Sequence, residues 1–197
     1  KWETTSQYNA GLDFAFFDNR ISGSVDVFQK QTYDLLQYIN VAPSTGFTKI
    51  TANQGDLENR GLEVSLGFDV VKNDNHTLNL YGNYSTYKTK ILNLDLPEAQ
   101  FGNQTFSAFL GNQISGGNFF KVPANIFIEG EEAALFWGYQ TQGIISNAAI
   151  LATAPTVRGL TPQLGDILYL DQNGDGNIDD KDLTVIGNPN PDFTFGF

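Results

Sequence analysis

The chain has 197 residues, and with 41% hydrophobic and 13% aromatic residues it carries too much apolar side chain to remain disordered. Its 11 Lys and Arg stand against 22 Asp and Glu, and the resulting formal charge of −11 opposes contact with nucleic-acid phosphates. The absence of Cys excludes disulfides, zinc–thiolate sites and cysteine nucleophiles, while the absence of Met leads us to expect a piece of a longer protein.

The first predicted element is a β-hairpin. Apolar and polar residues alternate over 8–16, a turn follows at 18–20, and the alternation resumes over 21–27. This spacing and turn chemistry are typical of two antiparallel strands joined directly.

A second hairpin repeats the plan. Alternation over 62–70 leads into a polar turn at 72–76, and a further strand begins at Leu78 and extends to Ile91. Both hairpins therefore have one apolar and one polar face.

The polar faces of the two hairpins leave two readings open. Their side chains are Asp13, Ser22, Ser24, Asp26, Glu63, Ser65, Asp69, Asn79 and Asn83. In a transmembrane barrel they would face a wet lumen while Leu, Val and Phe face lipid. In a soluble sheet they would line the solvated face, and alternation alone does not separate the two. No apolar run is long enough for a membrane-spanning helix, but barrel strands carry a weaker signal.

Short and long connections alternate along the chain. The stretches at about 33–60 and 93–134 are long, rich in Gly, Asn and Phe, and without clear period. An outer-membrane barrel has short turns on one side and long extracellular loops on the other, whereas a soluble sandwich has similar turns at both ends. We therefore predict an all-β fold, with antiparallel hairpins belonging to a large transmembrane β-barrel with long extracellular loops. No internal domain boundary is predicted within 1–197.

The C-terminal part predicts a strand over 135–145, a short one over 166–170 and the opening of another at 193–197, with no persuasive helix. Aromatic residues gather in the long segments and near them: Phe101, Phe106, Phe109, Phe119, Phe120, Phe127, Phe136, Trp137 and Tyr139. They could stack on sugars or peptides, but we expect most of them to pack loops together or to form a barrel's aromatic girdle.

The stretch 171–182 matches an EF-hand-type calcium loop. Such a loop needs oxygen ligands at positions one, three and five, glycine at six, a backbone carbonyl at seven and a carboxylate at twelve. The predicted calcium ligands are Asp171, Asn173, Asp175, Asn177 and Asp182, with Asp179 acting through water. Position twelve is Asp rather than Glu, and the flanks are not convincing helices. The alternative is an acidic loop of Asx turns that binds no metal.

Enzyme signatures are mostly absent. The sequence has no nucleophile elbow, phosphate-binding loop or dinucleotide motif, and its only histidine, His76, lies in a polar turn. Glu129, Glu131 and Glu132 are adjacent in an apparent loop, whereas a glycosidase needs two carboxylates on opposed sides of a sugar. We expect a non-catalytic protein, and a β-hydrolase using Glu129 or Glu132 is the weakest alternative.

Several motifs occur in a recognisable order along the chain. They lie at 1–13 with 19–26, at 53–63 (N-x-G-x-x-x-N-[KR]-G-x-E), at 136–144 (F-x-G-Y-x-x-x-G-I) and at 165–193, which includes the acidic loop. Together they resemble the C-terminal barrel segment of SusC/RagA-type TonB-dependent outer-membrane transporters of Bacteroidota. The resemblance covers essentially the whole chain.

The resemblance implies energised import across the bacterial outer membrane. Such transporters have a closed barrel in lipid, an N-terminal plug, a link to the TonB complex, and a SusD-like surface lipoprotein lid that captures oligosaccharides or peptides. The plug lies outside these residues, so we expect a partial barrel whose long loops contact substrate or lid. The alternative is a soluble, secreted, calcium-stabilised β-domain that binds carbohydrate.

Overall fold

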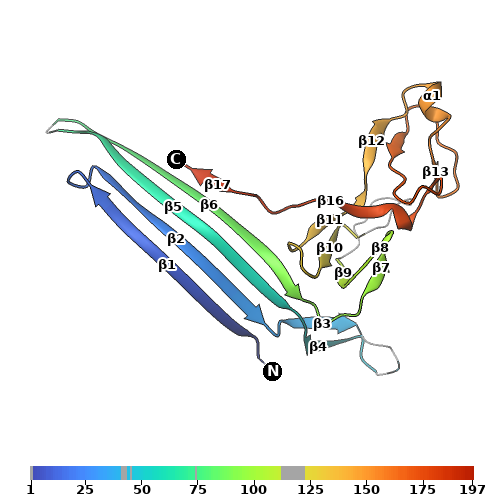
Figure 1. Cartoon of the computed structure of the whole chain (residues 1–197), viewed down its shortest axis with the longest axis horizontal. Coiled ribbons are helices and arrows are strands. Elements are labelled where there is room, and N and C mark those ends of the chain that lie inside the picture. The colour runs from blue at the N-terminus through green and yellow to red at the C-terminus, as the bar shows by residue number, and fades with distance from the viewer. Residues whose placement is uncertain (1, 41–43, 45, 74, 112–122) are drawn as a thin grey trace. The chain divides into compact units, whose positions relative to one another are not determined.

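The computed structural model of the chain describes residues 2–40, 44, 46–73, 75–111 and 123–197 (Figure 1). The chain folds into two compact units. The first, here called the sheet unit, comprises Lys1–Leu94, Gly130–Glu132 and Asn190–Phe197. The second, here called the loop unit, comprises Asp95–Glu129 and Ala133–Pro189. The sequence shows no such division, because no change of composition or linker accompanies it.

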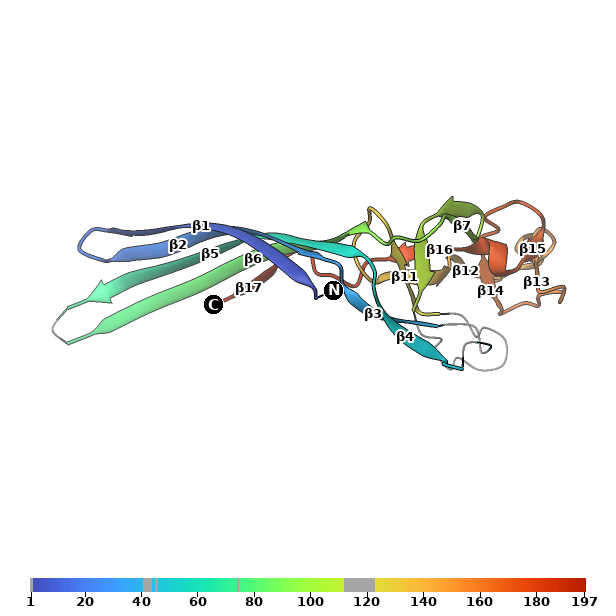
Figure 2. The same ribbon diagram turned by 90° about the horizontal axis from the view of Figure 1, so that it is seen from below.

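The sheet unit is a five-stranded antiparallel sheet in the order β1-β2-β5-β6-β17. Its strands are β1 (Thr4–Phe16), β2 (Ile21–Tyr33), β5 (Asp56–Lys72), β6 (Thr77–Asn93) and β17 (Thr194–Gly196). Figure 1 and Figure 2 show the long strands running side by side in a single layer. Both predicted hairpins are confirmed, and their strands are longer than predicted. The strand predicted at the C-terminus is β17, which pairs with β6.

The strand register places all the predicted polar side chains on one face, here called the polar face. Residues directly opposite each other in neighbouring strands share a face of the sheet. One row across the sheet is Asp13, Ser24, Ser65 and Asn83, and other rows pair Asp26 with Glu63, Ser22 with Gly67, and Asp69 with Asn79. The alternation seen in the sequence thus gathers these polar side chains on one surface of the sheet.

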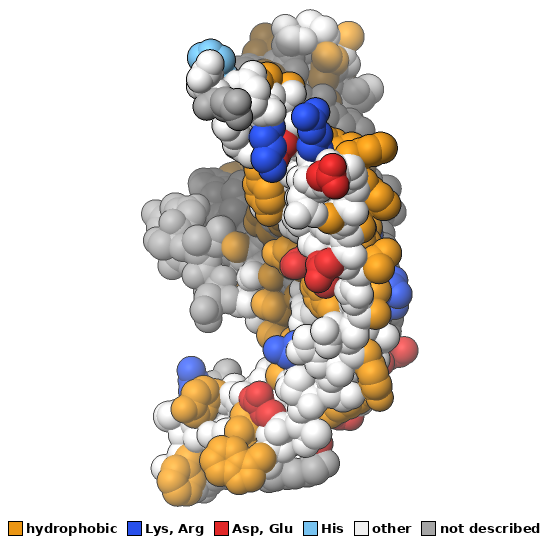
Figure 3. Space-filling view, turned by 90° about the vertical axis from the view of Figure 1, so that its left-hand side faces the viewer, with side chains coloured by type: hydrophobic (Ala, Val, Ile, Leu, Met, Phe, Trp, Pro, Cys, Tyr) orange, Lys and Arg blue, Asp and Glu red, His pale blue; other side chains and the backbone are white. Residues whose placement is uncertain are grey.

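The opposite face, here called the apolar face, is covered with exposed hydrophobic side chains. Its rows are Leu12, Val25, Val64 and Tyr84, then Phe16, Ile21, Phe68 and Leu80. Leu12 is 66% exposed and Leu80 is 56% exposed. Figure 3 shows hydrophobic side chains in orange running along one side of the sheet, beside polar and charged ones. An apolar surface of this extent suits contact with lipid.

Short and long connections lie at opposite ends of these strands. The turns after β1 and β5 are short, and Phe17, Asp18 and Asn19 have left-handed backbone conformations. The connection after β2 carries its own hairpin, in which β3 (Leu36–Asn40) pairs with β4 (Lys49–Asn53). The connection from β6 to β17 contains the whole loop unit.

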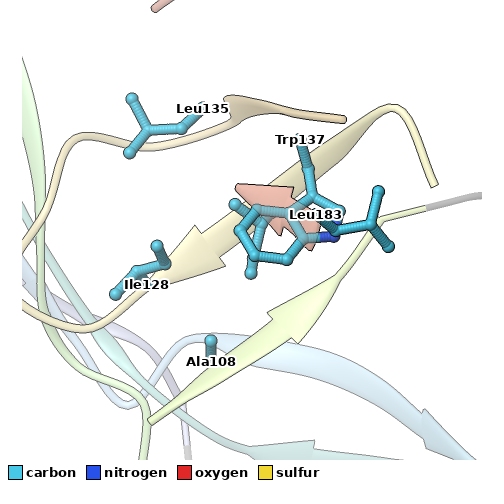
Figure 4. Close-up of a cluster of buried hydrophobic side chains, with 6 residues drawn as sticks. Ala108, Ile128, Leu135, Trp137 and Leu183 are labelled. Carbon is cyan, nitrogen blue, oxygen red and sulfur yellow. The ribbon is translucent and has the colours of Figure 1, made fainter. Parts of the chain in front are cut away.

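The loop unit has a small hydrophobic core. It is built on a four-stranded sheet in the order β16-β11-β10-β9. These strands are β9 (Ala108–Leu110), β10 (Asn125–Ile128), β11 (Leu135–Tyr139) and β16 (Leu183–Gly187). Their buried side chains are Ala108, Ile126, Ile128, Leu135, Trp137 and Leu183, and Figure 4 shows this cluster.

Shorter elements complete the loop unit. They are β7 (Ala99–Phe101) paired with β8 (Gln104–Phe106), β12 (Thr141–Ile144) paired with β14 (Ile167–Tyr169), β13 (Thr156–Val157) paired with β15 (Asn177–Ile178), α1 (Ala148–Leu151) and the 3-10 turn η2 (Asp180–Asp182). No helix among the described residues is long and apolar enough to cross a membrane.

One expectation about this region needs correction. The single strand predicted over 135–145 is two strands in different sheets, because β11 ends at Tyr139 and β12 begins at Thr141. The sequence contains no persuasive helix, and the helix α1 in this region is a single turn of four residues. Its N-terminus is capped by Asn147, whose side chain accepts a hydrogen bond from the N–H of Ile150 at 3.0 Å.

The aromatic residues mostly pack the loops, as predicted. The rings of Phe101 and Phe106 stack at 5.4 Å, and Phe106 meets Trp137 edge-on. Phe109 and Phe127 stack at 4.6 Å between the neighbouring strands β9 and β10. The predictions for Phe119 and Phe120 lie outside the described residues.

Candidate functional site

The polar face carries a concentration of carboxylates. Asp26 and Glu63 lie directly opposite each other on β2 and β5, in a row that continues to Gly11 and Ser85. Like charges in direct cross-strand register are unfavourable unless water or a partner charge relieves them. Gly11 leaves room for the Asp26 carboxylate, because a Cβ at position 11 would collide with it. This arrangement suits a surface that stays wet.

Hydroxyl and amide groups hold the rest of the polar face together. The hydroxyls of Ser24 on β2 and Ser65 on β5 form a hydrogen bond of 2.8 Å. Near the short turns, Asp69 accepts hydrogen bonds from Asn79 and from Lys72, the latter at 3.1 Å. The face therefore offers polar groups along most of the strand length.

The acidic loop at 171–182 folds around the carboxylate of Asp171. This carboxylate accepts hydrogen bonds from the N–H groups of Gly174 at 2.6 Å and Gly176 at 2.7 Å. The side chains of Asn173 and Asp175 each accept a hydrogen bond from the N–H two residues further on, at 2.9 Å. Gly176, at position six, has φ of 81°, so the sharp turn that a calcium loop requires is present.

Asp182 closes the loop from its other end. It is fully buried, and its carboxylate accepts hydrogen bonds from the N–H groups of Gln172 and Asp179, both at 2.8 Å. Ile178, also fully buried, lies in β15, which pairs with β13. Position twelve is thus fixed beside the start of the loop by hydrogen bonds.

The loop keeps Asp171 ionised. Partial burial acts to raise the pKa of this carboxyl, but the backbone N–H groups of Gly176, Gly174, Asp175 and Asn173 outweigh it and hold the pKa below its ordinary value. An anion stabilised by surrounding N–H groups is a suitable first ligand for a hard cation.

The types of oxygen ligand in the loop suit calcium, but the directions in which their side chains point suit it less well. Carboxylate, amide and carbonyl oxygens are the ligands that calcium takes, and each stands at its expected loop position. In the described residues, however, no three His, Cys, Asp or Glu side chains gather as a metal site. The carboxylates of Asp171 and Asp182 turn instead to backbone N–H groups. Calcium at Asp171, Asn173, Asp175, Asn177, Asp179 and Asp182 therefore stays a prediction.

Sequence reasoning missed a polar contact beside this loop. Arg158 donates a hydrogen bond to the carboxylate of Asp180 at 2.6 Å, and the hydroxyl of Tyr139 lies 3.4 Å from each. Burial is the main reason why the pKa of Tyr139 is raised. Tyr139 and Asp180 belong to different motifs and Arg158 to none, so only the fold brings the three residues together.

The glutamates considered for hydrolysis have structural contacts. Glu132 forms an ion pair with Lys88 at 3.3 Å, and the carbonyl of Glu131 accepts a hydrogen bond from the N–H of Ile91 at 2.9 Å. Gly130 donates to the carbonyl of Ile91 at 2.8 Å. Residues 130–132 are thus fastened along the end of β6. Glu129 belongs to the loop unit.

Comparison with protein families finds one match over nearly the whole chain. The family described as TonB dependent receptor-like, beta-barrel matches residues 1–194. The chain is 34% identical over 197 residues to TonB-dependent receptor P3 of Formosa agariphila, and 30% identical over 197 residues to TonB-dependent receptor SusC of Bacteroides thetaiotaomicron. These matches cover 100% of this chain but only 19% and 18% of the two relatives. The chain thus spans about a fifth of their length.

Solved structures show the same fold. The structure described as that of the RagAB peptide transporter matches 99% of this chain and 19% of its own chain, with a TM-score of 0.66 and 24% identity. The RagAB peptide importer in its open-open state matches with a TM-score of 0.65 and 22% identity. At these identities the likeness concerns the fold of the chain.

Proposed function

The chain belongs to the TonB-dependent receptor-like β-barrel family, and on that premise we propose that it forms part of an energised nutrient importer. Members of this family are outer-membrane β-barrels, so the alternative of a soluble secreted domain does not hold. The named relatives are receptors and transporters rather than enzymes.

The observation that carries this proposal is the two-faced sheet. A lipid-facing apolar face and a largely polar face on the same long strands are what a barrel wall around a wet lumen requires. In this arrangement Asp26 and Glu63 line the lumen, where water solvates them. The wall supplies the passage, while energy coupling belongs to parts of the protein beyond these residues.

The substrate we propose is an oligosaccharide or a peptide, captured with the help of a SusD-like surface lipoprotein. The loop unit supports this because it is inserted between β6 and β17, on the strand ends that carry the long connections. In outer-membrane barrels those connections are extracellular. The loop unit would therefore be available to a lid or a substrate outside the cell.

Calcium is the cofactor we propose for the acidic loop. The ligand order, the left-handed glycine at position six and the ionised Asp171 support it. When bound, the ion would neutralise the loop's carboxylates and stiffen the loop. The chain's own residues already hold the loop ends together through Asp182.

The test uses the full-length protein in its own bacterium. Cells that carry or lack its gene are offered labelled neutral oligosaccharides and labelled short peptides, with and without a functional TonB complex. We expect one class to accumulate only when both the protein and TonB are present. Accumulation of neither class, or accumulation that ignores TonB, would contradict the proposal. A tagged protein should also co-purify a surface lipoprotein, and its recovery without one would overturn that part.

A further inference from the structure

The apolar face ends abruptly towards the long connections. The last apolar row is Ala10, Val27 and Leu62, with Thr86 beside them. The next row on the same face is Tyr8, Gln29, Arg60 and Lys88, and the row after it is Ser6, Gln31, Glu58 and Lys90. The face that meets lipid thus changes, within one row, into a band that contains three cations.

Arg60, like Lys90, acts through its charge on the carboxylate of Glu58 in the next row. It is exposed, and it forms no ion pair with any residue in the described part of the chain. Its neighbour Glu58 is buried and is held by other groups, since its carboxylate accepts hydrogen bonds from Gln29 at 2.6 Å and Gln31 at 2.9 Å. Lys88 is paired with Glu132 but its side chain remains 57% exposed.

A hollow lies beside Arg60 on this face. It has a volume of about 420 Å³, and its lining includes Tyr8, Ala10, Val27, Gln29 and Arg60. Apolar side chains therefore line one part of the hollow, and a guanidinium and an amide line another. This combination fits an amphipathic molecule whose acyl part rests on Ala10 and Val27 and whose anionic part meets Arg60.

We propose that this hollow binds the phosphate-bearing headgroup of an outer-leaflet lipid. Arg60 contacts the phosphate, with Lys88 and Lys90 beside it, while the acyl chains follow the apolar rows below. Position supports this occupant, because the long connections mark the extracellular side and the cationic rows stand where the hydrocarbon region ends. A guanidinium matches phosphate geometry through paired hydrogen bonds. This inference goes beyond import and rests on the membrane placement given under the proposed function, namely which face meets lipid and which strand ends are extracellular.

The test uses the full-length protein purified in detergent. Its thermal unfolding is followed while lipid A that carries phosphate, lipid A with its phosphate removed, or inorganic phosphate is added. We expect only the phosphorylated lipid to stabilise the protein. The variant Arg60→Gln should bind this lipid about fivefold more weakly, because one basic residue near a charged membrane surface contributes roughly 1 kcal/mol. Arg60→Lys should keep part of the effect because it keeps the charge.

A matched control lies on the opposite face at the same level. Lys30 is paired in register with Asn59, next to the Gln29 and Arg60 pair, but it points to the polar face. Lys30→Gln should leave lipid binding unchanged. The proposal is overturned if Lys30→Gln weakens binding as much as Arg60→Gln, if dephosphorylated lipid stabilises equally, or if inorganic phosphate alone reproduces the effect.

Discussion

The ring of Phe28 on β2 lies over Gly61 on β5. A Cβ built at position 61 would come within 2.7 Å of the ring and 2.6 Å of the carbonyl oxygen of Thr86. Both distances are too short for any side chain, so this position requires glycine. Gly61 also belongs to the motif at 53–63, and the Phe28 contact gives that glycine a physical reason.

Gly61→Ala should therefore destabilise the sheet by about 1–3 kcal/mol, as expected for overpacking. Unfolding of the full-length protein in detergent, followed by the heat-dependent shift in gel mobility of folded barrels, measures this. Gly82→Ala on β6 is the control, because a Cβ there would meet only the carbonyl oxygen of Gly196, at 3.5 Å. Equal losses in both variants would show that Phe28 is not the cause.

Calcium should slow amide hydrogen exchange over 171–182 in the full-length protein, since the ion would bind several of the loop's carboxylates at once and stabilise the folded loop. Asp171→Ala and Asp175→Ala should abolish this protection. Asp180→Asn, at loop position ten, removes a charge that is not a predicted ligand and should leave it intact. If calcium does not slow exchange over 171–182 in the unmodified protein, the loop is an ordinary acidic turn and the calcium proposal fails.

Acid should loosen the same loop through Asp171. The folded chain holds the pKa of this carboxyl below its unfolded value, so its contribution to stability is fully present above the unfolded pKa. It is lost as the pH falls through the lowered folded-state pKa. Exchange over 171–182 in calcium-free buffer should rise in that range. Asp171→Asn should remove the pH dependence, and an unchanged profile in this variant would contradict the assignment.

Substitutions of Arg158 separate two effects on stability: the cost of its strained backbone and the contribution of its exposed ion pair. Its φ is 50°, in the left-handed region, and its partner Asp180 has a side chain that is 74% exposed. Exposed pairs contribute little, about 0–1 kcal/mol. Arg158→Gly should therefore be more stable than Arg158→Ala by about 1 kcal/mol, because only glycine relieves the strain. Hydrogen exchange at 156–160 compares the two, and equal protection would show that φ carries no cost.

The sequence predicts the sheet unit well because alternation is a local signal. The polar side chains that the sequence assigns to one face, from Asp13 in β1 to Asn83 in β6, do share a face, as period two requires. The loop unit was predicted less well. Its strands are two to five residues long, and its core joins Ala108 to Leu183 across most of the unit. Contacts between residues so far apart in the sequence produce no periodic pattern from which they could be predicted.

The acidic loop shows the same limit at a smaller scale. The order of its oxygen ligands and the need for a turn at Gly176 can be read from spacing alone. The burial of Asp182 and its bond to Gln172 depend on how the loop packs, as does the contact between Arg158 and Asp180. The spacing of residues therefore predicts which oxygen atoms the loop contains, but it does not predict the directions of their side chains.

The pairing of β17 with β6 has a consequence for how the chain is assembled. Thr194 meets Ser85 through their hydroxyls at 2.6 Å, although 109 positions separate them. Bringing such distant segments together costs more loop-closure entropy than zipping a hairpin, and non-local pairing slows folding. Each of the two hairpins needs only a short turn to close. The β6–β17 pairing closes over the whole inserted unit, so we expect it to form after the two hairpins.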